Sequence, residues 1–283
     1  SFITANAADM KGRGVDVGLH SNNLNRNIKW TTDFIFNYNF SVTSKYFTDG
    51  STSIATLLSD GDLLSPVIGK PLYAIAAYKW GGLDSEGNPQ GYLDGKLSTD
   101  YKGLKAAALE NGLKSGVFVY VGSATPNYFG SLLNRFTFKG ISLSFNLRYK
   151  FGYFLRKPTF GYVGLAASGS GLDYYKSRWK KPGDENFTNV PSVTYPLDAN
   201  RDTFFGYSDI NVIKGDHIRL QFVNLSYTFL KHNKRLPFKS LQMYVNASNL
   251  GIVWRANTDH VDPDYANVIP NPKSFTLGVK ANF

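Results

Sequence analysis

The chain has 283 residues, of which 42% are apolar, only 18% are charged and 15% are aromatic. No apolar run approaches the roughly 18 residues that a membrane helix needs, which excludes a helical membrane protein. The net charge of +10 comes from scattered Lys and Arg rather than from a basic stripe, which argues against nucleic-acid binding. Cysteine is absent, so disulfides, thiolate metal sites and cysteine nucleophiles are excluded too.

Alternating apolar and polar side chains predict eight or nine β-strands along the chain. The runs are 14–20, 30–40, 72–80, 116–121, 128–138, 140–155, 216–230, 241–249 and 275–283. Several are longer than the strands of soluble sandwiches, which have about five or six residues. Long amphipathic strands of this kind predict an all-β, antiparallel transmembrane β-barrel.

The connections between these runs differ in length. Short connectors are expected at 21–26, 139–140 and 231–238, and long ones at 41–71, 81–127, 156–215 and 251–273. Membrane barrels combine short periplasmic turns with long extracellular loops, whereas a compact soluble domain rarely does. If the last strand ends in the periplasm, the loops 156–215 and 251–273 lie outside the cell.

Two details of the strands are predicted. Lys139 and Gly140 separate two alternating runs, which indicates a hairpin with a tight turn. In the run 216–230 the apolar parity changes between Phe222 and Val223. A β-bulge at that point would restore one apolar face.

The parity of each strand also predicts which side chains meet lipid. In the run 140–155, the odd positions from Ile141 to Tyr153, among them Phe145, form the expected lipid-facing side. Side chains of the opposite parity face the lumen, where substitutions tune selectivity. The lumen-facing candidates are Arg135, Arg148, Lys150, Arg219 and Tyr244.

Neither a metal site nor a catalytic constellation stands out. The four histidines are isolated from one another in the sequence. Asp259, Asp262 and Asp264 could supply oxygen ligands to Ca²⁺, but an ordinary turn around Pro263 is favoured. We therefore predict no enzyme activity, no metal and no cofactor.

Three tryptophans lie in or beside the long loops: Trp80, Trp179 and Trp254. An exposed indole could stack on a sugar or peptide ligand. Equally, these residues could belong to an interfacial aromatic belt or anchor the interior of a loop. The sequence leaves both interpretations open.

Several segments, in the same order, resemble the C-terminal barrel region of SusC/RagA-type TonB-dependent outer-membrane transporters. They are KGRGVDVGL at 11–19, GKPLYAIAAYKWGGLDSEGNP at 69–89, VGSATPNYFGSLLNRFTFKGISL at 121–143, RWKKPGDENFTNVP at 178–191, KGDHIRLQFVNLSYTF at 214–229 and MYVNASNL at 243–250. Ala76 and Ala77 depart from the family, which often has Tyr and Gly there. The terminal Phe283 resembles the signal by which outer-membrane barrels are recognised for assembly.

The resemblance implies that residues 1–283 are the C-terminal portion of a barrel of about 22 strands around a plug. The plug and the N-terminal barrel strands would then lie upstream of this chain. The expected location is the outer membrane, in contact with its lipid. The implied partners are a SusD-like surface lipoprotein, the TonB complex acting through the missing N-terminal region, and a glycan or oligopeptide ligand.

Two alternatives remain open at this stage. A self-contained small porin or anchor barrel would fold from these 283 residues alone. A secreted glycan-binding β-sandwich would be soluble without detergent, but it would leave the long lipid-matched faces unexplained.

Overall fold

The computed structural model describes residues 8–47, 58, 66–169, 172–230 and 238–282. Phe283, the expected assembly signal, lies outside them. Backbone contacts divide the chain into two compact units. The sheet unit contains residues 13–40, 126–152 and 215–283, and the helical unit contains residues 1–12, 41–125 and 153–214. No helix among the described residues is long and apolar enough to cross a membrane.

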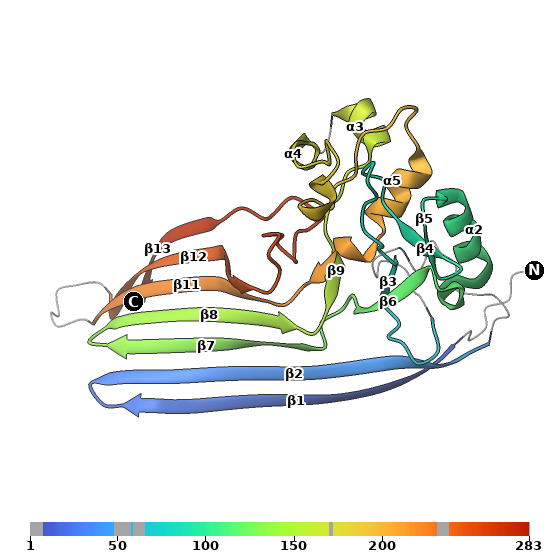
Figure 1. Cartoon of the computed structure of the whole chain (residues 1–283). Coiled ribbons are helices and arrows are strands. Elements are labelled where there is room, and N and C mark those ends of the chain that lie inside the picture. The colour runs from blue at the N-terminus through green and yellow to red at the C-terminus, as the bar shows by residue number, and fades with distance from the viewer. Residues whose placement is uncertain (1–7, 48–57, 59–65, 170–171, 231–237, 283) are drawn as a thin grey trace, which may run out of the picture. The chain divides into compact units, whose positions relative to one another are not determined.

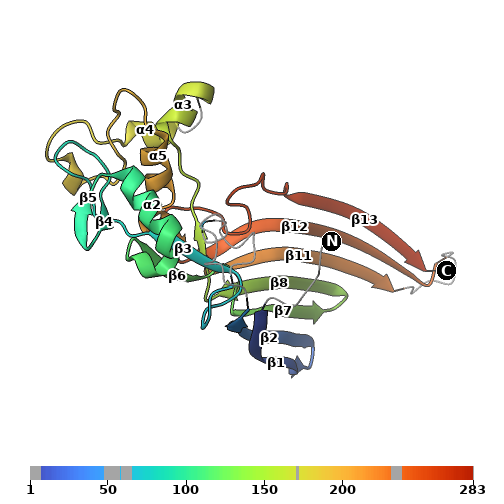
Figure 2. The same ribbon diagram turned by 90° about the vertical axis from the view of Figure 1, so that its right-hand side faces the viewer.

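Seven strands form one sheet, and their order across the sheet is the same as their order along the chain, as Figures 1 and 2 show. They are β1 (Ala8–Asn25), β2 (Ile28–Tyr46), β7 (Tyr128–Phe138), β8 (Ile141–Phe151), β11 (His217–Leu230), β12 (Ser240–Arg255) and β13 (Ser274–Asn282). Every pairing from β2 to β13 is antiparallel. Within the described part of the chain, β1 and β13 are the two edges of this sheet.

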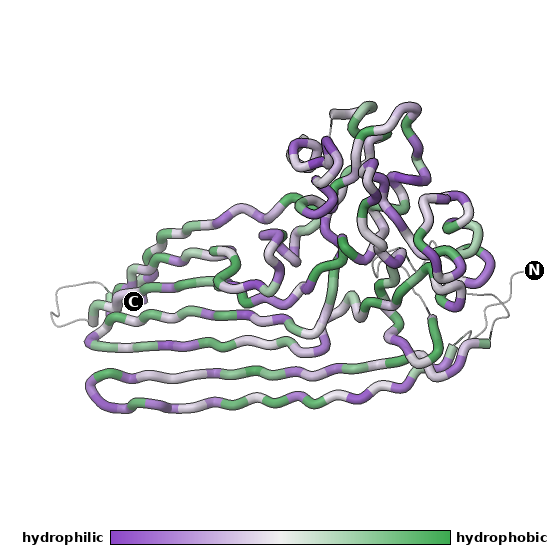
Figure 3. Tube along the Cα trace, in the orientation of Figure 1, coloured by the Kyte–Doolittle hydropathy of each residue, from purple (hydrophilic) through white to green (hydrophobic). Residues whose placement is uncertain are grey.

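The long alternating runs predicted from the sequence are all strands of this sheet. Figure 3 shows the alternation of hydrophobic and hydrophilic residues along them. The strands extend further than the alternation alone indicated. β1 and β2 are joined only by residues 26–27, and β12 continues to Arg255, so the last long loop is 256–273.

The predicted hairpin between β7 and β8 is confirmed, and its backbone explains its sequence. Lys139 has φ 45° and Gly140 has φ 86°. Two consecutive positive φ values are what a two-residue turn needs to match the twist of the flanking strands. An added Cβ on Gly140 would also lie 2.7 Å from the backbone oxygen of Thr228.

Replacing Gly140 with alanine is expected to lower the free energy of unfolding by about 1–2 kcal/mol, because a Cβ is strained at this φ. Gly18→Ala, in a strand of the same sheet, is the matched control, since nothing lies within 4 Å of its added Cβ. Urea titration of the folded protein measures both. Equal stabilities of the two variants would contradict this explanation of the turn.

The β-bulge in β11 is present, but the predicted position is wrong by about one residue. The register shifts between Leu220 and Phe222, so Gln221 is the extra residue. Phe222 therefore pairs with Asn146 and lies on the polar face rather than on the apolar one. A second shift in the pairing with β12 follows Ile218.

The run 140–155 does not form one strand, which corrects the expected position of Tyr153. β8 ends at Phe151, and Gly152 follows with φ 76°. Beyond it, β9 (Phe154–Arg156) pairs with β10 (Val212–Lys214) in the helical unit. Tyr153 is buried there instead of lying on the apolar face of the sheet.

The helical unit is built mainly from segments that were expected to be long loops, together with the two shorter runs 72–80 and 116–121, which were predicted as strands and overlap strands of this unit. Its remaining strands are β3 (Ala74–Tyr78), β4 (Gly91–Leu93), β5 (Lys96–Ser98) and β6 (Phe118–Ser123), which pair as β3–β6 and β4–β5. Its helices are α2 (Tyr101–Asn111), α3 (Tyr162–Ser168), α4 (Leu172–Lys176) and α5 (Ala199–Gly206), with short 3₁₀ turns η1 (Gly112–Ser115), η2 (Asp184–Asn186) and η3 (Asp209–Asn211). The chain is therefore mostly β rather than all-β.

The helical unit has a hydrophobic core of its own. Tyr78, Leu104, Val117, Phe118 and Phe204 are among its buried side chains. Aspartates cap the two longest helices: Asp100 accepts from the backbone N of Gly103, and Asp198 from that of Asn200. Capping satisfies backbone donors that a helix start leaves free, so these segments are ordered elements rather than bare connectors.

Candidate functional site

The sheet has one apolar and one polar face, and cross-strand partners define them, because residues directly opposite each other share a face. Phe145 pairs with Val223, and Leu225 pairs with both Leu143 and Val245. On the other face, Asn224 pairs with Ser144 and Asn246. The two sets alternate along each strand and so form two continuous faces.

The structure places all five candidates that were predicted to face the lumen on the polar face. Arg219 pairs directly with Arg148, and Lys150 pairs with His217. Arg135 pairs with Ser144, while Tyr244 pairs with Ser226 and Gly278. They do not share one environment, however, and three different arrangements result.

Lys150 and Arg219 are held by the loop between β12 and β13. Lys150 Nζ lies 2.6 Å from Asp264 Oδ1, and Arg219 Nε lies 3.0 Å from Asp264 Oδ2. Arg219 Nη2 also reaches Asp262 Oδ1 at 2.5 Å. Their charges are therefore used within the protein, and they fix residues 256–273 to the polar face.

His217 completes this cluster from the first position of β11. Its Nε2 lies 3.3 Å from Asp264 Oδ2, its Nδ1 lies 2.8 Å from the backbone oxygen of Gly215, and its side chain is only 2% exposed. Burial by itself raises the pKa of Asp264, but hydrogen bonds from His217 and Lys150 outweigh it and lower that pKa. Asp264 therefore carries its charge at neutral pH.

In the same cluster, the carboxylates of the acidic loop are engaged in ion pairs. Asp262 and Asp264 form the predicted turn, in which the backbone N of Asp264 donates to Asp262 Oδ1 at 3.0 Å. Their carboxylates face the cations of β8 and β11. The described residues contain no group of three His, Cys, Asp or Glu side chains arranged to hold a metal ion.

Tyr244 is packed against the neighbouring strand. A Cβ added to Gly278 of β13 would come within 2.3 Å of the Tyr244 ring, so the ring covers that glycine. By contrast, Arg135 and Arg148 are exposed and have no hydrogen-bond or ion-pair partner within the described residues. They are the predicted lumen-facing cations whose charges stay available.

A groove on the polar face contains one of these two arginines. It has a volume of about 430 Å³ and lies between β7, β8, β11 and β12. Its lining, together with two serines, consists of Arg135, Gln221, Asn224, Asn246, Leu133 and Phe222. We call it the polar groove. Of these residues, only Arg135 was predicted from the sequence as a candidate functional residue. The amide side chains at polar positions of neighbouring strands could also have indicated this groove.

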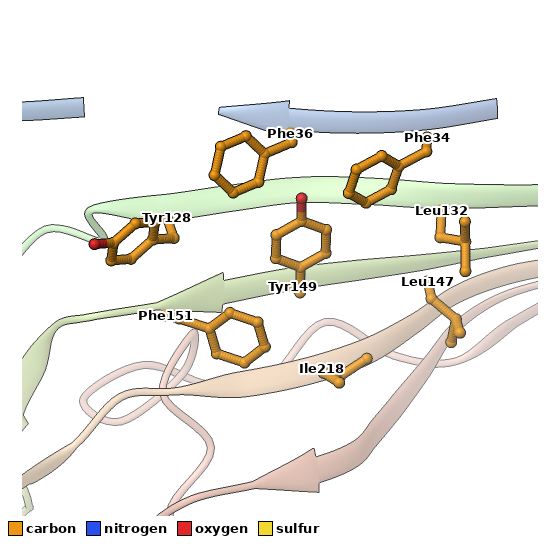
Figure 4. A pocket seen from close by; sticks show the side chains of 8 residues that line it. All are labelled: Phe34, Phe36, Tyr128, Leu132, Leu147, Tyr149, Phe151 and Ile218. Atoms are coloured by element: carbon orange, nitrogen blue, oxygen red, sulfur yellow. The ribbon is translucent and has the colours of Figure 1, made fainter. Parts of the chain in front are cut away.

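The apolar face carries a second depression, shown in Figure 4. Its volume is about 470 Å³, and the rings of Phe34, Phe36, Tyr149 and Phe151 contribute to its wholly apolar lining. Nearby on the same face, buried Asn134 accepts hydrogen bonds from Trp30 Nε1 and Thr32 Oγ1. The side-chain oxygen of Asn134 and these two donors are thus paired, as an apolar surrounding requires.

Two of the three tryptophans anchor the helical unit. The Trp80 ring lies 6.4 Å from that of Phe204, and its backbone N donates to Asp209. Trp179 Nε1 donates to Glu185 Oε2 at 2.9 Å, and this hydrogen bond is the main cause that lowers the pKa of Glu185. Both rings are partly buried rather than presented as open platforms.

Trp254 has a different environment. It pairs with Ile218 on the apolar face of the sheet, next to the end of β12, and its ring lies edge-on to that of Phe151 at 6.0 Å. It is 47% exposed. It therefore lies at the border of the apolar face rather than within the helical unit.

Comparison with solved structures finds the same fold in a peptide transporter. The chain matches "Structure of the RagAB peptide transporter" with a TM-score of 0.70 and 20% identity, over 98% of this chain and 29% of that chain. The 'open-open' and 'closed-closed' states of the RagAB peptide importer match with TM-scores of 0.69 and 20% identity, over 97% and 98% of this chain and 29% and 30% of theirs. No protein-family model and no curated protein matches the chain.

The chain thus spans less than a third of the length of the transporter chains that it matches. At 20% identity the likeness concerns the fold. It extends over nearly the whole chain, including the succession of long strands and intervening segments. The structure therefore confirms, at the level of the fold, the resemblance to SusC/RagA-type transporters that the sequence motifs indicated.

Proposed function

We propose that this chain is the C-terminal part of the β-barrel of an outer-membrane importer for large nutrients, glycans or oligopeptides. The observation that carries the proposal is a long antiparallel meander with one apolar and one polar face, in the same fold as a RagAB chain. β7 and β8 have 11 residues each. A tilted strand needs about 9–11 residues to cross the hydrocarbon layer.

The exposure of the apolar face favours lipid over water as its surroundings. Phe275, Leu277 and Val279 are 71%, 74% and 62% exposed, and Leu225 and Val245 of the neighbouring strands are also exposed. A soluble sandwich would cover such a face with a second sheet, because large exposed apolar patches promote association. The polar face would then line the lumen, where its hydrogen-bonding groups meet water and ligand.

A larger barrel is favoured over a self-contained one. The described residues contribute seven strands to the sheet and leave two edges. Bacterial single-chain barrels have an even number of strands, from 8 upward, and closure removes their edges. Upstream strands of the same polypeptide would complete the barrel and enclose a plug.

The partners of the importer are proposals of the same kind. A SusD-like surface lipoprotein would cover the extracellular segments, and the TonB complex would act through the upstream region to release the ligand inward. The matched structures are those of a peptide transporter, which supports transport rather than catalysis for this chain. Residues 1–283 would then contribute barrel wall and extracellular elements, without an enzymatic step.

The intact mass of the polypeptide, extracted by detergent from outer membranes, tests this proposal. An antibody against residues 1–283 would detect it, and proteins that copurify would be identified by mass spectrometry. A polypeptide of about 100 kDa, with a copurifying surface lipoprotein, is expected from the importer. A polypeptide of about 31 kDa without a partner would contradict it and favour the small barrel.

A further inference from the structure

The depression on the apolar face is walled by aromatic rings from three neighbouring strands, β2, β7 and β8, as Figure 4 shows. The Tyr149 ring lies 6.2 Å from that of Phe34 and 5.5 Å from that of Phe151, and both pairs are stacked. The Tyr149 hydroxyl donates to the backbone oxygen of Ile35 at 2.9 Å. We call this feature the aromatic depression. Because its lining is wholly apolar, it suits the acyl chain of a lipid.

In the proposed barrel, the aromatic depression stays on the outside when upstream strands are added. Its walls belong to β2, β7, β8 and β11, each of which has a neighbour on both sides within the sheet. Upstream strands would join the sheet at its edges, β1 and β13, and a plug would lie against the polar face. The depression therefore remains open to the surroundings of the barrel.

The aromatic depression lies toward the extracellular ends of the strands. Tyr128 begins β7, Phe151 ends β8, and Ile218 is the second residue of β11. Next to these strand ends the chain passes into the helical unit. The proposed importer places such long segments outside the cell. The depression then meets the outer leaflet, which in an outer membrane consists of phosphorylated glycolipids with several acyl chains.

An exposed cation lies on the same face, beyond the aromatic depression. The guanidinium of Arg13 in β1 lies 5.5 Å from the centroid of the Phe40 ring. Phe40 shares the parity of Tyr38 in β2 and lies about 7 Å beyond it along the strand. The Tyr38 ring stacks at 5.0 Å on that of Tyr128, which lines the depression. Among the residues that the structure describes, Arg13 has neither a hydrogen-bond nor an ion-pair partner.

This cation decides which lipid is favoured. An acyl chain exchanges one apolar surrounding for another when it moves from the bilayer into the depression, so only packing favours it there. A guanidinium, by contrast, forms two parallel charge-assisted hydrogen bonds with a phosphate. A phosphorylated glycolipid gains both interactions at once, with its phosphate on Arg13 and an acyl chain in the depression. A neutral lipid gains the packing alone.

We propose that the apolar face carries a specific site for a phosphorylated glycolipid of the outer leaflet, with the lipid phosphate on Arg13 and an acyl chain in the aromatic depression. The inference rests on the proposed importer function, since it takes the apolar face to meet the outer leaflet. It adds a lipid ligand and the residue that selects it. A second copy of the transporter is the competing occupant of an exposed apolar face.

Lipid A with its phosphates, and the same lipid A after enzymatic dephosphorylation, test the site. The full-length transporter is placed in phosphatidylcholine nanodiscs with equal amounts of both, and native mass spectrometry measures which lipid stays bound. The phosphorylated form is expected in at least about 10-fold excess, as charge-assisted hydrogen bonds provide. Arg13→Gln should abolish this preference. Arg148→Gln, which removes an exposed charge from the polar face, should keep it.

Two further variants test the acyl chain. Leu147→Trp fills the aromatic depression and should lower the binding of both lipids, because no room is left between the rings. Leu225→Trp enlarges an exposed side chain of the same face outside the depression and should leave binding unchanged. Both variants keep the face apolar, so neither disturbs membrane insertion. Equal effects of the two, or a phosphate preference that survives Arg13→Gln, would overturn the proposal.

The same spectra distinguish the competing occupant. A lipid-free dimer of the transporter that Leu147→Trp separates would show that a second copy covers the aromatic depression, and would overturn the lipid site. The mass and membrane location of the polypeptide are measured separately. A transporter of the expected mass without phosphate preference therefore refutes the lipid site alone, whereas a protein absent from the outer membrane refutes the importer as well.

Discussion

Phe145→Arg is expected to lower the free energy of unfolding of the membrane-inserted protein by about 2–4 kcal/mol, the cost of an arginine at the bilayer midplane on the lipid face of a barrel. Phe145 lies near the middle of β8 and pairs with Val223 on the apolar face. Its ring stacks on that of Phe136 at 6.3 Å. In the proposed barrel, the substitution would place a charge in hydrocarbon and would also remove an aromatic contact.

Two control variants separate these effects. Phe145→Leu removes the ring contact but stays apolar, so its loss should be about 1 kcal/mol. Ser142→Arg places the same charge on the polar face of the same strand, opposite Thr137 and Ser226, and should cost little. Urea titration in phospholipid vesicles measures all three. If Ser142→Arg were as costly as Phe145→Arg, the assignment of the lipid-facing side would be wrong.

The sheet could be predicted from the sequence because the alternation of side chains within each strand reflects the surroundings of its two faces. The alternation from Ile141 to Phe151 defines both the strand and its two faces, and Lys139-Gly140 defines the turn before it. Periodicity alone does not reveal where a sheet ends. Tyr153 continues the alternation, but the positive φ of Gly152 turns the chain into the helical unit.

The position of the bulge shows a second limit. The apolar side chains of Leu220 and Val223 can share one face only if the strand contains one extra residue. The apolar pattern favours a bulge that also keeps Phe222 on that face. The structure places the bulge at Gln221 instead, because the pairing with β8 resumes at Phe222–Asn146. One apolar ring on the polar face then becomes part of a groove that parity arguments could not indicate.

The charged cluster could not be predicted, although its members were noticed separately. Lys150 and Asp264 are 114 positions apart, and Arg219 lies 45 positions before Asp264. Nothing local in the sequence pairs them. Asp100 and Asp198 are the opposite case: a capping residue before a helix is a local signal, and it could have revealed the helices within the long connections.

Asp264→Asn is expected to destabilise the loop 256–273 and the adjoining ends of β8 and β11 by about 3 kcal/mol. The side chain of Arg219 is only 6% exposed, and that of Asp264 is 22% exposed. Removing one member of such a pair leaves a partly buried cation without its counter-charge, which costs about 3–5 kcal/mol in fully buried cases. Arg219 keeps Asp262, so the lower end of that range applies.

The pH dependence of the difference between the unsubstituted protein and Asp264→Asn identifies the cause. The pKa of Asp264 is lowered in the folded state, so its contribution to stability is complete above the ordinary carboxyl pKa of about 4 and is lost as the pH falls through the lower folded value. The difference should therefore shrink as the pH falls below about 4. Lys150, Arg219 and His217 are the groups that face Asp264.

Trypsin reports on the loop directly, because it can cleave after Arg255 and Lys273, which flank residues 256–272. Asp264→Asn should be cleaved there faster than the unsubstituted protein. Asp16→Asn, which removes an exposed carboxylate from β1, is the matched control and should be cleaved at the unsubstituted rate. Unchanged cleavage of Asp264→Asn together with unchanged stability would mean that the ion pairs do not fix this loop, and that Lys150 and Arg219 are as available for ligand as Arg135.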